Sequence, residues 1–463
     1  MFSKENYITR RNVLREKTGS GVILLLGNEE VGINYRDNVF TFRQDSTFLY
    51  YFGLDKPGLA AVIDTESGND IVFGDNPSMD DVVWTGPQIL IQDQAVRCGI
   101  GEVQPLSVLN TYIKESVEKG LKIRYLLPYR YRQHLFLSEL FSKSVEEVKK
   151  GISIELTKNI VDQRLIKGDE EIGELDKAVS ITSKMHLRAM EYARPGMKEQ
   201  HVMAEIYRIA LEEGPGVSFS PIVSIRGEVL HNHFYNNTLK EGQLLLVDAG
   251  AESGMHYAGD MTRTFPVSGT FTGKQSDVYQ IVLNAQNAAI EALRPGIPYK
   301  EVHLLAANTI VDGLKTIGIM KGDTQEAVSA GAHAMFFPHG LGHMMGLDVH
   351  DMENFGEKYV GYDESTDKSE QFGLNFLRLA KKLVPGYVLT IEPGIYFIPP
   401  LIEKWKNEKK SAEFINFSKL DKYLDFGGIR IEEDFLITSG GSRLLGSPVA
   451  KEIAEVETIR AGA

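Results

Sequence analysis

The chain has 463 residues, more than one hydrophobic core ordinarily organises, so we expect two domains. Hydrophobic residues make up 43% and charged residues 24%, which is typical of a globular protein that folds in water. The formal net charge of −13 disfavours nucleic acid and anionic membranes as partners, because phosphate binding needs positive patches. The single cysteine, Cys98, excludes an intramolecular disulfide and favours a reducing, cytoplasmic location. No signal peptide or membrane-spanning run is visible.

The first part of the chain alternates helical and strand patterns, so residues 1–168 are predicted to form a small α/β domain. An amphipathic helix is expected at about 7–20, followed by a wholly apolar strand of the parallel type at 21–26. Residues 60–64 and 70–74 are predicted to pair as a hairpin. We find no catalytic constellation in this domain.

The remainder of the chain contains an imperfect internal repeat. Arg294-Pro-Gly296 recurs one hundred residues after Arg194-Pro-Gly196, and each triplet ends one helix and precedes another. Each helix pair is followed by a histidine-bearing segment and then by two strands that carry an acid. Helices are expected at 169–192, 199–213 and 300–316, with Asp169 as the N-cap of the first. This order predicts two structurally related halves.

Each half supplies two acids at its strands. Asp248 ends an apolar strand, and Asp260 is expected on the strand that returns beside it, so that an antiparallel pair brings the two together. Glu392 ends its own strand at a Pro-Gly, and Glu432 shares one face of an alternating segment with Arg430. If a pseudo-twofold axis relates the halves, the four acids converge.

A run of histidines accompanies these acids. His339, His343 and His350 fall within a dozen residues and are separated by glycines that let the backbone come close to a ligand. Four buried carboxylates repel one another unless cations are present. Together with one histidine they suit manganese (Mn2+) and its neighbours, and a metal pair about 3.5–4 Å apart can hold a bridging hydroxide as nucleophile. The alternatives are a Gly-rich turn with solvent-facing histidines and, for any single acid, a purely structural role.

The motifs resemble a known family. Residues from about 170 onward are similar to the pita-bread (creatinase/methionine aminopeptidase) fold, and the first domain is similar to the N-terminal domain of prolidases and aminopeptidases P. The resemblance implies an α+β protein in which an internally duplicated pita-bread catalytic domain, 169–463, follows the α/β domain, 1–168. The motifs that carry it are Phe42-Arg-Gln-Asp-Ser46, Asp248-Ala-Gly, Asp260-Met-Thr-Arg-Thr-Phe, His339-Gly-Leu-Gly-His343, Asp348-Val-His-Asp351, Ile391-Glu-Pro-Gly-Ile-Tyr396 and Arg430-Ile-Glu-Glu-Asp434.

The resemblance also implies a metal centre. Two divalent metal ions, taken to be Mn2+, would be held by five side chains. Asp260 and Glu432 would bridge both ions, Asp248 would bind one ion, and His343 and Glu392 would bind the other. Glu392 would also guide the proton of the bridging water.

Further residues are implied around the metals. His231, His339 and His350 would line the substrate site, with one polarising the scissile carbonyl or its oxyanion and another holding the proline side. His231 is preferred to the neighbouring His233 by its distance from the first metal ligand. Arg430 would steady the ligands, and Tyr396 would act beside them and help to bind the substrate.

One departure from the family pattern concerns the first two acids. The spacing from Asp248 to Asp260 is one residue longer than family members usually show. We expect the extra residue in the hairpin turn at about 252–255. A bulge within the strand would instead rotate Asp260 away from the site.

The implied activity is that of an exopeptidase hydrolysing the Xaa-Pro bond, with a metal-bridging hydroxide as the nucleophile. An Xaa-Pro dipeptidase is favoured because Arg378 stands where prolidases carry an arginine that receives a dipeptide's carboxylate. The long excursion at 397–426 is expected to close off the space beyond the proline. The alternatives are an aminopeptidase P acting on longer peptides, with Arg378 as one more charge on a solvated helix, and a metal-free binding module. The expected partners are small peptides with proline in second position and a second copy of the chain in a homodimer.

Overall fold

The computed structural model describes residues 1–462. The chain divides into two compact units, Met1–Arg164 and Leu165–Ala463, whereas the sequence placed the boundary after residue 168. Within the described residues, no helix has both the length and the apolar character that crossing a membrane requires.

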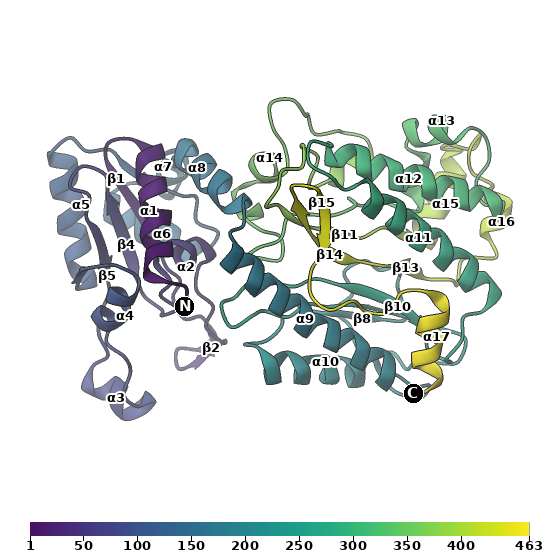
Figure 1. Cartoon of the computed structure of the whole chain (residues 1–463), viewed down its shortest axis with the longest axis horizontal. Helices are drawn as coiled ribbons and strands as arrows, with labels where there is room; N and C mark the ends of the chain where they lie inside the picture. The colour runs from purple at the N-terminus through teal and green to yellow at the C-terminus, as the bar shows by residue number, and fades with distance from the viewer. Residues whose placement is uncertain (463) are drawn as a thin grey trace. The chain divides into compact units, whose positions relative to one another are not determined.

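The first unit is built on a five-stranded sheet with the strand order β6-β5-β4-β1-β7 (Figure 1). The strand β1 (Val22–Leu26) is buried because it lies inside the sheet, antiparallel to β4 (Ala60–Asp64) and parallel to β7 (Ile123–Tyr125). β4 also pairs antiparallel with β5 (Asp70–Phe73), which confirms the predicted hairpin, and β6 (Glu102–Gln104) runs parallel to β5. The sheet is therefore mixed rather than wholly parallel.

The other elements of this unit surround the sheet or connect its strands. They are α1 (Lys4–Thr18), β2 (Gly32–Tyr35), β3 (Asn38–Val39), α2 (Ser46–Phe52), α3 (Met79–Thr85), α4 (Ile91–Arg97), η1 (Leu106–Val108), α5 (Leu109–Glu118), α6 (Tyr131–Phe141), α7 (Val145–Lys150) and α8 (Ile154–Leu165).

The second unit contains two helix pairs, α9 (Asp169–Tyr192) with α10 (Glu199–Glu213), and α11 (Gly273–Ala292) with α12 (Tyr299–Thr316). Figure 1 shows the first pair along one side of the strands and the second pair along the other. Asp169, expected as an N-cap, is instead the first helical residue of α9. The N-cap is Gly168, whose N–H donates to the Glu171 carboxylate at 3.1 Å.

The repeated Arg-Pro-Gly triplets form the same turn twice. Gly196 and Gly296 have φ angles of +88° and +86°, a region that glycine occupies without a steric penalty. The N–H of Gly196 donates to the carbonyl of Leu239, and that of Gly296 donates to the carbonyl of Leu383, each at 2.8 Å. This correspondence confirms the internal duplication.

The strands of the two halves also correspond. In the first half, β9 (Leu244–Asp248) lies between β8 (Ile222–Ser224) and β10 (Thr262–Pro266), antiparallel to both. In the second half, β11 (Val388–Ile391) lies between β14 (Glu433–Thr438) and the segment around Met344, which forms a bridge with Leu389. The remaining elements are β12 (Gly394–Tyr396), β13 (Gly428–Arg430), β15 (Gly441–Leu444), α13 (Thr324–Ser329), η2 (Ala332–Met335), η3 (Glu353–Phe355), α14 (Glu357–Val360), η4 (Leu374–Phe376), α15 (Pro399–Glu408), α16 (Phe417–Leu420) and α17 (Ile453–Ala461).

Candidate functional site

The first two acids come from the hairpin that joins β9 to β10. Asp248 is the last residue of β9 and pairs with Thr262, the first residue of β10. Beyond the strands, Glu252 pairs with Ala258 in the same register, so no bulge separates the two pairs. Asp260 therefore lies just before β10, not on it as expected, but it remains on a regular ladder. The longer spacing is accommodated in the turn at 253–257.

The second two acids face each other across two antiparallel strands. β11 continues through Glu392 and Pro393 into β12, while β13 continues through Ile431 and Glu432 into β14. The pairs β11–β14 and β12–β13 share one register, which places Glu392 opposite Glu432. The N–H of Glu432 donates to the carbonyl of Thr262 at 3.1 Å, so the two halves of the unit meet at this point.

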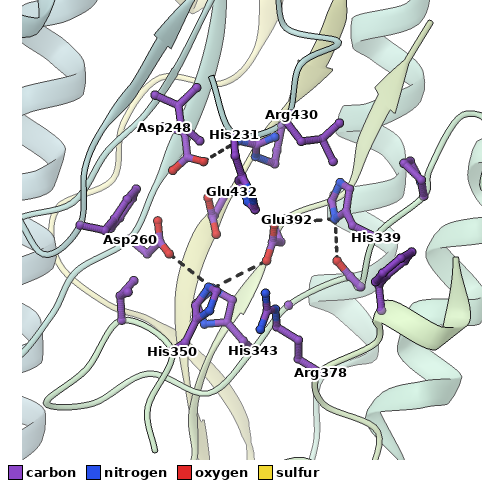
Figure 2. A pocket seen from close by; sticks show the side chains of 18 of the residues that line it. His231, Asp248, Asp260, His339, His343, His350, Arg378, Glu392, Arg430 and Glu432 are labelled. Atoms are coloured by element: carbon purple, nitrogen blue, oxygen red, sulfur yellow. Dashed lines mark hydrogen bonds and ion pairs between the residues drawn. The ribbon is translucent and has the colours of Figure 1, made fainter. Parts of the chain in front are cut away.

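His343 lies beside β11 and points at the acids. Its N–H donates to the Thr390 hydroxyl, and the Thr390 N–H donates to its carbonyl, both at 3.1 Å. The ring is buried, and Nδ1 lies 3.2 Å from the Met344 carbonyl, to which it can only donate. Nε2 then lies 3.4 Å from Asp260 Oδ2 and 3.7 Å from Glu392 Oε1 (Figure 2). An imidazole fixed in this way offers its lone pair to a metal ion.

Acids that are buried together repel one another unless a cation lies among them. Ligand atoms of Asp260, His343 and Glu432 lie within 4.8 Å of one another. Figure 2 shows Asp248 and Glu392 directed toward the same space. Burial, followed by repulsion from the neighbouring acid, raises the pKa of Asp260 and of Glu432 well above the usual range. Burial also raises the pKa of Glu392 to about 7.

A divalent cation fits this set of donors. Oδ1 of Asp260 is buried and has no hydrogen-bond partner among the described residues, and leaving such an atom unpaired is costly. Carboxylate oxygens and an imidazole are ligands that Mn2+ and its neighbours accept. Cations placed among the acids would relieve both the repulsion and the unpaired oxygen.

Arg430 connects the acids to the rest of the site. Its Nη2 donates to Asp248 Oδ2 at 2.5 Å, Nη1 donates to the Tyr396 hydroxyl at 2.8 Å, and Nε donates to the Thr262 hydroxyl at 3.1 Å. That hydroxyl in turn donates to Glu432 Oε2 at 2.7 Å. Arg430, which the sequence predicted to steady the ligands, thus contacts Asp248 directly. Thr262 was not predicted, although its place two residues after an acid, on the same strand face, was a usable signal.

His339 is held in one tautomer. Its Nδ1 lies 2.8 Å from the Gly340 carbonyl, and its Nε2 lies 2.9 Å from the Tyr396 hydroxyl. Burial, reinforced by the positive charge of Arg430, lowers the pKa of His339 to about 3, so the ring is neutral near pH 7. Because a carbonyl only accepts, Nδ1 carries the proton and the hydroxyl of Tyr396 donates to Nε2. The ring is therefore fixed 3.8 Å from Glu392 Oε2.

The other histidines lie at the wall of the same cavity. The rings of His350 and His343 have centroids 4.1 Å apart. His231 and His233 are both exposed and both line the cavity. The charges of Arg430 and Asp248 act on His231, whereas His233 lies near the hydroxyl of Tyr235.

The cavity has a volume of about 750 Å³, within the range of about 300–1,000 Å³ that is usual for ligand pockets. Of the described residues between 397 and 426, none lines it, so the expectation that this excursion closes off the cavity is wrong. Side chains from 219–233 and 357–378 form the wall instead. His231 and Arg378 in these segments were expected, whereas sequence reasoning missed Phe219, Ile222, Lys368 and Phe376, which belong to no motif.

Arg378 lines the cavity but is already paired. It follows η4 and lies outside any helix, so the solvated-helix alternative is wrong. Its guanidinium, about one third exposed, forms ion pairs with Glu353 and, at 3.7 Å, with Glu357. Glu353 also lies 3.3 Å from Nδ1 of His350, and it was not predicted.

The comparisons with known proteins agree with this geometry. Two family models match, metallopeptidase family M24 at residues 173–439 and the aminopeptidase P N-terminal domain at residues 7–124. A probable Xaa-Pro aminopeptidase of Metarhizium robertsii is 32% identical over 446 residues, which cover 96% of this chain and 92% of that protein. The human Xaa-Pro dipeptidase is 32% identical over 454 residues, which cover 95% of this chain and 89% of that protein. The solved structure of zinc-substituted Escherichia coli aminopeptidase P in complex with product has a TM-score of 0.82 and 30% identity, covering 99% and 98% of the two chains.

These matches confirm the pita-bread fold, the preceding aminopeptidase P type domain and the assignment as a metallopeptidase, a class that uses divalent metal ions. The M24 model alone spans more than half of the sequence, and the relatives cover nearly all of it. The chain belongs to metallopeptidase family M24.

Proposed function

We propose that this protein is a metal-dependent Xaa-Pro aminopeptidase, which releases the first residue of peptides that carry proline in second position. The observation that carries the proposal is the convergence of four carboxylates and a fixed imidazole on one cavity. We propose that these groups hold two divalent ions and that Mn2+ is the ion to test first. The proposed ligands are Asp248, Asp260, His343, Glu392 and Glu432.

The remaining residues have roles that follow from their positions. Bound divalent ions supply a Lewis acid for the scissile carbonyl and lower the pKa of water. Glu392, with carboxylate oxygens 3.7 and 3.8 Å from two histidine rings, is placed to accept the proton of the attacking water. Arg430 and Tyr396 orient the acids and His339. His231 and His350, at the cavity wall, would donate to the carbonyl oxygen and to the departing proline nitrogen.

Three observations support an aminopeptidase over the dipeptidase that the sequence favoured. The guanidinium of Arg378 is already neutralised by Glu353, so a dipeptide's carboxylate would have to displace a carboxylate that is in place. No described residue of the excursion at 397–426 lines the cavity. The first unit matches an aminopeptidase P domain, and the Metarhizium robertsii relative carries that name. The dipeptidase remains the second candidate, because Arg378 does reach the cavity and the human relative is a dipeptidase.

A length series of peptides tests the proposal. Purified protein is first analysed for metal, and about two equivalents of a divalent ion are expected. With Mn2+, kcat/KM for Ala-Pro-Ala and Ala-Pro-Ala-Ala should equal or exceed that for Ala-Pro, while Ala-Ala-Ala should resist cleavage. Hydrolysis confined to Ala-Pro would establish the dipeptidase instead. Absence of both metal and hydrolysis would favour a binding module.

The interaction partners form part of the same proposal. The charge of −13 argues against nucleic acid and anionic membranes as partners. The homodimer and the cytoplasmic location expected from the sequence stay predictions. Sedimentation of the metal-loaded protein tests the first, and fractionation of cells tests the second.

A further inference from the structure

A buried ion pair lies outside the groups that line the cavity. Nζ of Lys167 is 2.9 Å from Oδ2 of Asp351, and both side chains are only 1% exposed. We propose that this pair positions His350 for the reaction, so that Lys167 and Asp351 are positioning residues. The inference rests on the proposed function, in which His350 acts on the substrate.

The burial of both charges requires a specific reason. Removing two ions from water costs several kcal/mol for each ion, and an apolar pair of similar volume is often as stable or more stable. A buried ion pair is therefore weak evidence of added stability. Unlike an apolar contact, an ion pair is directional, so it holds the two segments that carry its charges in one relative position.

The Asp351 end closes the loop that carries the histidines. The N–H of Asp351 donates to the Met344 carbonyl at 3.0 Å. Its carboxylate packs on Gly346, where even a Cβ atom would come within 2.3 Å of Oδ2. The loop at 344–351 is thereby folded back on itself, which brings the ring of His350 against that of His343.

The Lys167 end is attached to the strands that carry the acids. The N–H of Lys167 donates to the Gly386 carbonyl at 2.9 Å, and the N–H of Gly386 donates to the Ile437 carbonyl at 2.8 Å. Gly386 precedes β11, and Ile437 belongs to β14. The ion pair thus ties the loop of His350 to the ladder from which Glu392 and Glu432 project.

Loss of the pair should displace His350 and spare the metal ligands. His343 is held separately, by the two bonds that it shares with Thr390. The expected result is a loop that opens more readily around His350 while the metal content stays unchanged.

Hydrogen exchange of the Mn2+-loaded protein tests the position of the loop without any substrate. The variants are Lys167→Met and the double variant Lys167→Met/Asp351→Asn, which removes both charges of the pair together and so is expected to fold. In both, amides at 344–353 should exchange at least about tenfold faster than in the wild type. Arg443→Met is the control, because it breaks an ion pair with Asp176, 2.8 Å long, elsewhere in the same unit. Unchanged exchange at 344–353 in the double variant would overturn the inference.

Kinetics then test whether the pair acts through His350. The double variant should lose roughly ten- to a hundredfold in kcat, the size expected for a small misplacement, with metal content and KM little changed. In a His350→Ala background the same substitutions should have almost no further effect on kcat, because residues that act as one unit are not additive. Additive losses would contradict a role through His350. If the wild type cleaves no Xaa-Pro peptide, the proposed function fails, and the exchange experiment still decides whether the pair holds the loop.

Discussion

Replacing Asp260 by asparagine should raise the stability of the metal-free protein and reduce the stabilisation that metal binding adds. Without metal, Asp260 is one of several buried acids that repel one another, and its pKa is raised chiefly by burial and then by Asp248. A raised pKa means that the folded state binds the proton more tightly than the unfolded chain does. The stability of the metal-free protein therefore falls as the pH rises above the pKa that this carboxyl has in the unfolded chain. The amide of Asp260→Asn carries no charge and removes this penalty, but it is a poor ligand.

The magnitude follows from the geometry. Ligand atoms of Asp260 and Glu432 lie within 4.8 Å. At that separation two unit charges repel by about 3–4 kcal/mol at an effective dielectric constant of 20. Keeping an ordinary carboxyl protonated at pH 7 costs a similar amount, about 4 kcal/mol. The metal-free variant should therefore gain up to about 3 kcal/mol, on the order of 6–12 °C in Tm. Metal at a hundred times its Kd should stabilise the wild type by about 2.7 kcal/mol.

Thermal denaturation of both proteins, in chelator and in Mn2+, measures these effects. We expect the variant to melt higher than the wild type in chelator, to gain less from Mn2+ and to show no hydrolysis. Asp176→Asn is a matched control, because that acid is partly exposed and pairs with Arg443, away from the proposed ligands. Turnover by Asp260→Asn with full metal occupancy, or equal stabilisation of both proteins by Mn2+, would refute the reasoning.

Four further substitutions give distinct outcomes. His339→Ala and His350→Ala should retain metal and lose roughly 10²–10³-fold in kcat, the size expected for one positioned acid or oxyanion donor, and loss of metal from either variant would show that it removes a ligand. Arg378→Ala should change kcat/KM for dipeptides and tripeptides about equally, because the guanidinium is already paired, and a loss of ten- to a hundredfold for dipeptides alone would restore the dipeptidase interpretation. His303 is buried with its pKa lowered to about 3 by burial and then by His333, so the neutral ring contributes stability that is lost as pH falls from about 6.5 toward 3. His303→Phe should reduce the slope of stability against pH by about 1.4 kcal/mol per unit between pH 5 and 6, as measured by denaturant unfolding, and an unchanged slope would show that the ring is not buried in its neutral form.

Much of the site could be predicted because its signals are local. Asp248 and Glu392 were each predicted at the end of an apolar strand. Their short motifs, Asp248-Ala-Gly and Glu392-Pro-Gly, stand at corresponding places in the two repeats. The strands, the long helices and the repeated turn at Gly196 and Gly296 follow from periodicity and from Pro-Gly stop signals. The direct opposition of Glu392 and Glu432 could not be predicted, because periodicity within a strand does not specify which residue of another strand lies opposite.

The residues that sequence reasoning missed are defined by distant partners. Lys167 and Asp351 are 184 positions apart, and neither position carries a pattern that indicates burial of a charge. The pairing of Arg378 with Glu353 was also not predicted. An arginine that is paired with a carboxylate of the protein is no longer free to bind a substrate's carboxylate. In both cases the role of the charged residue depends on a partner that only the tertiary structure brings close.

The division of the proposed ligands between the two repeats gives the metal ions a mechanical role. Asp248 and Asp260 come from the repeat that ends with β10, while His343, Glu392 and Glu432 come from the repeat that begins with α11. Neither repeat alone supplies enough donors for two ions, so the binding energy becomes available only when the repeats are closed on each other. The metals would therefore act as a crosslink across the middle of the catalytic unit. In a chain cut in the connection at 267–272, the cofactor would add to the contacts that already join the two halves, and a chelator would weaken their association.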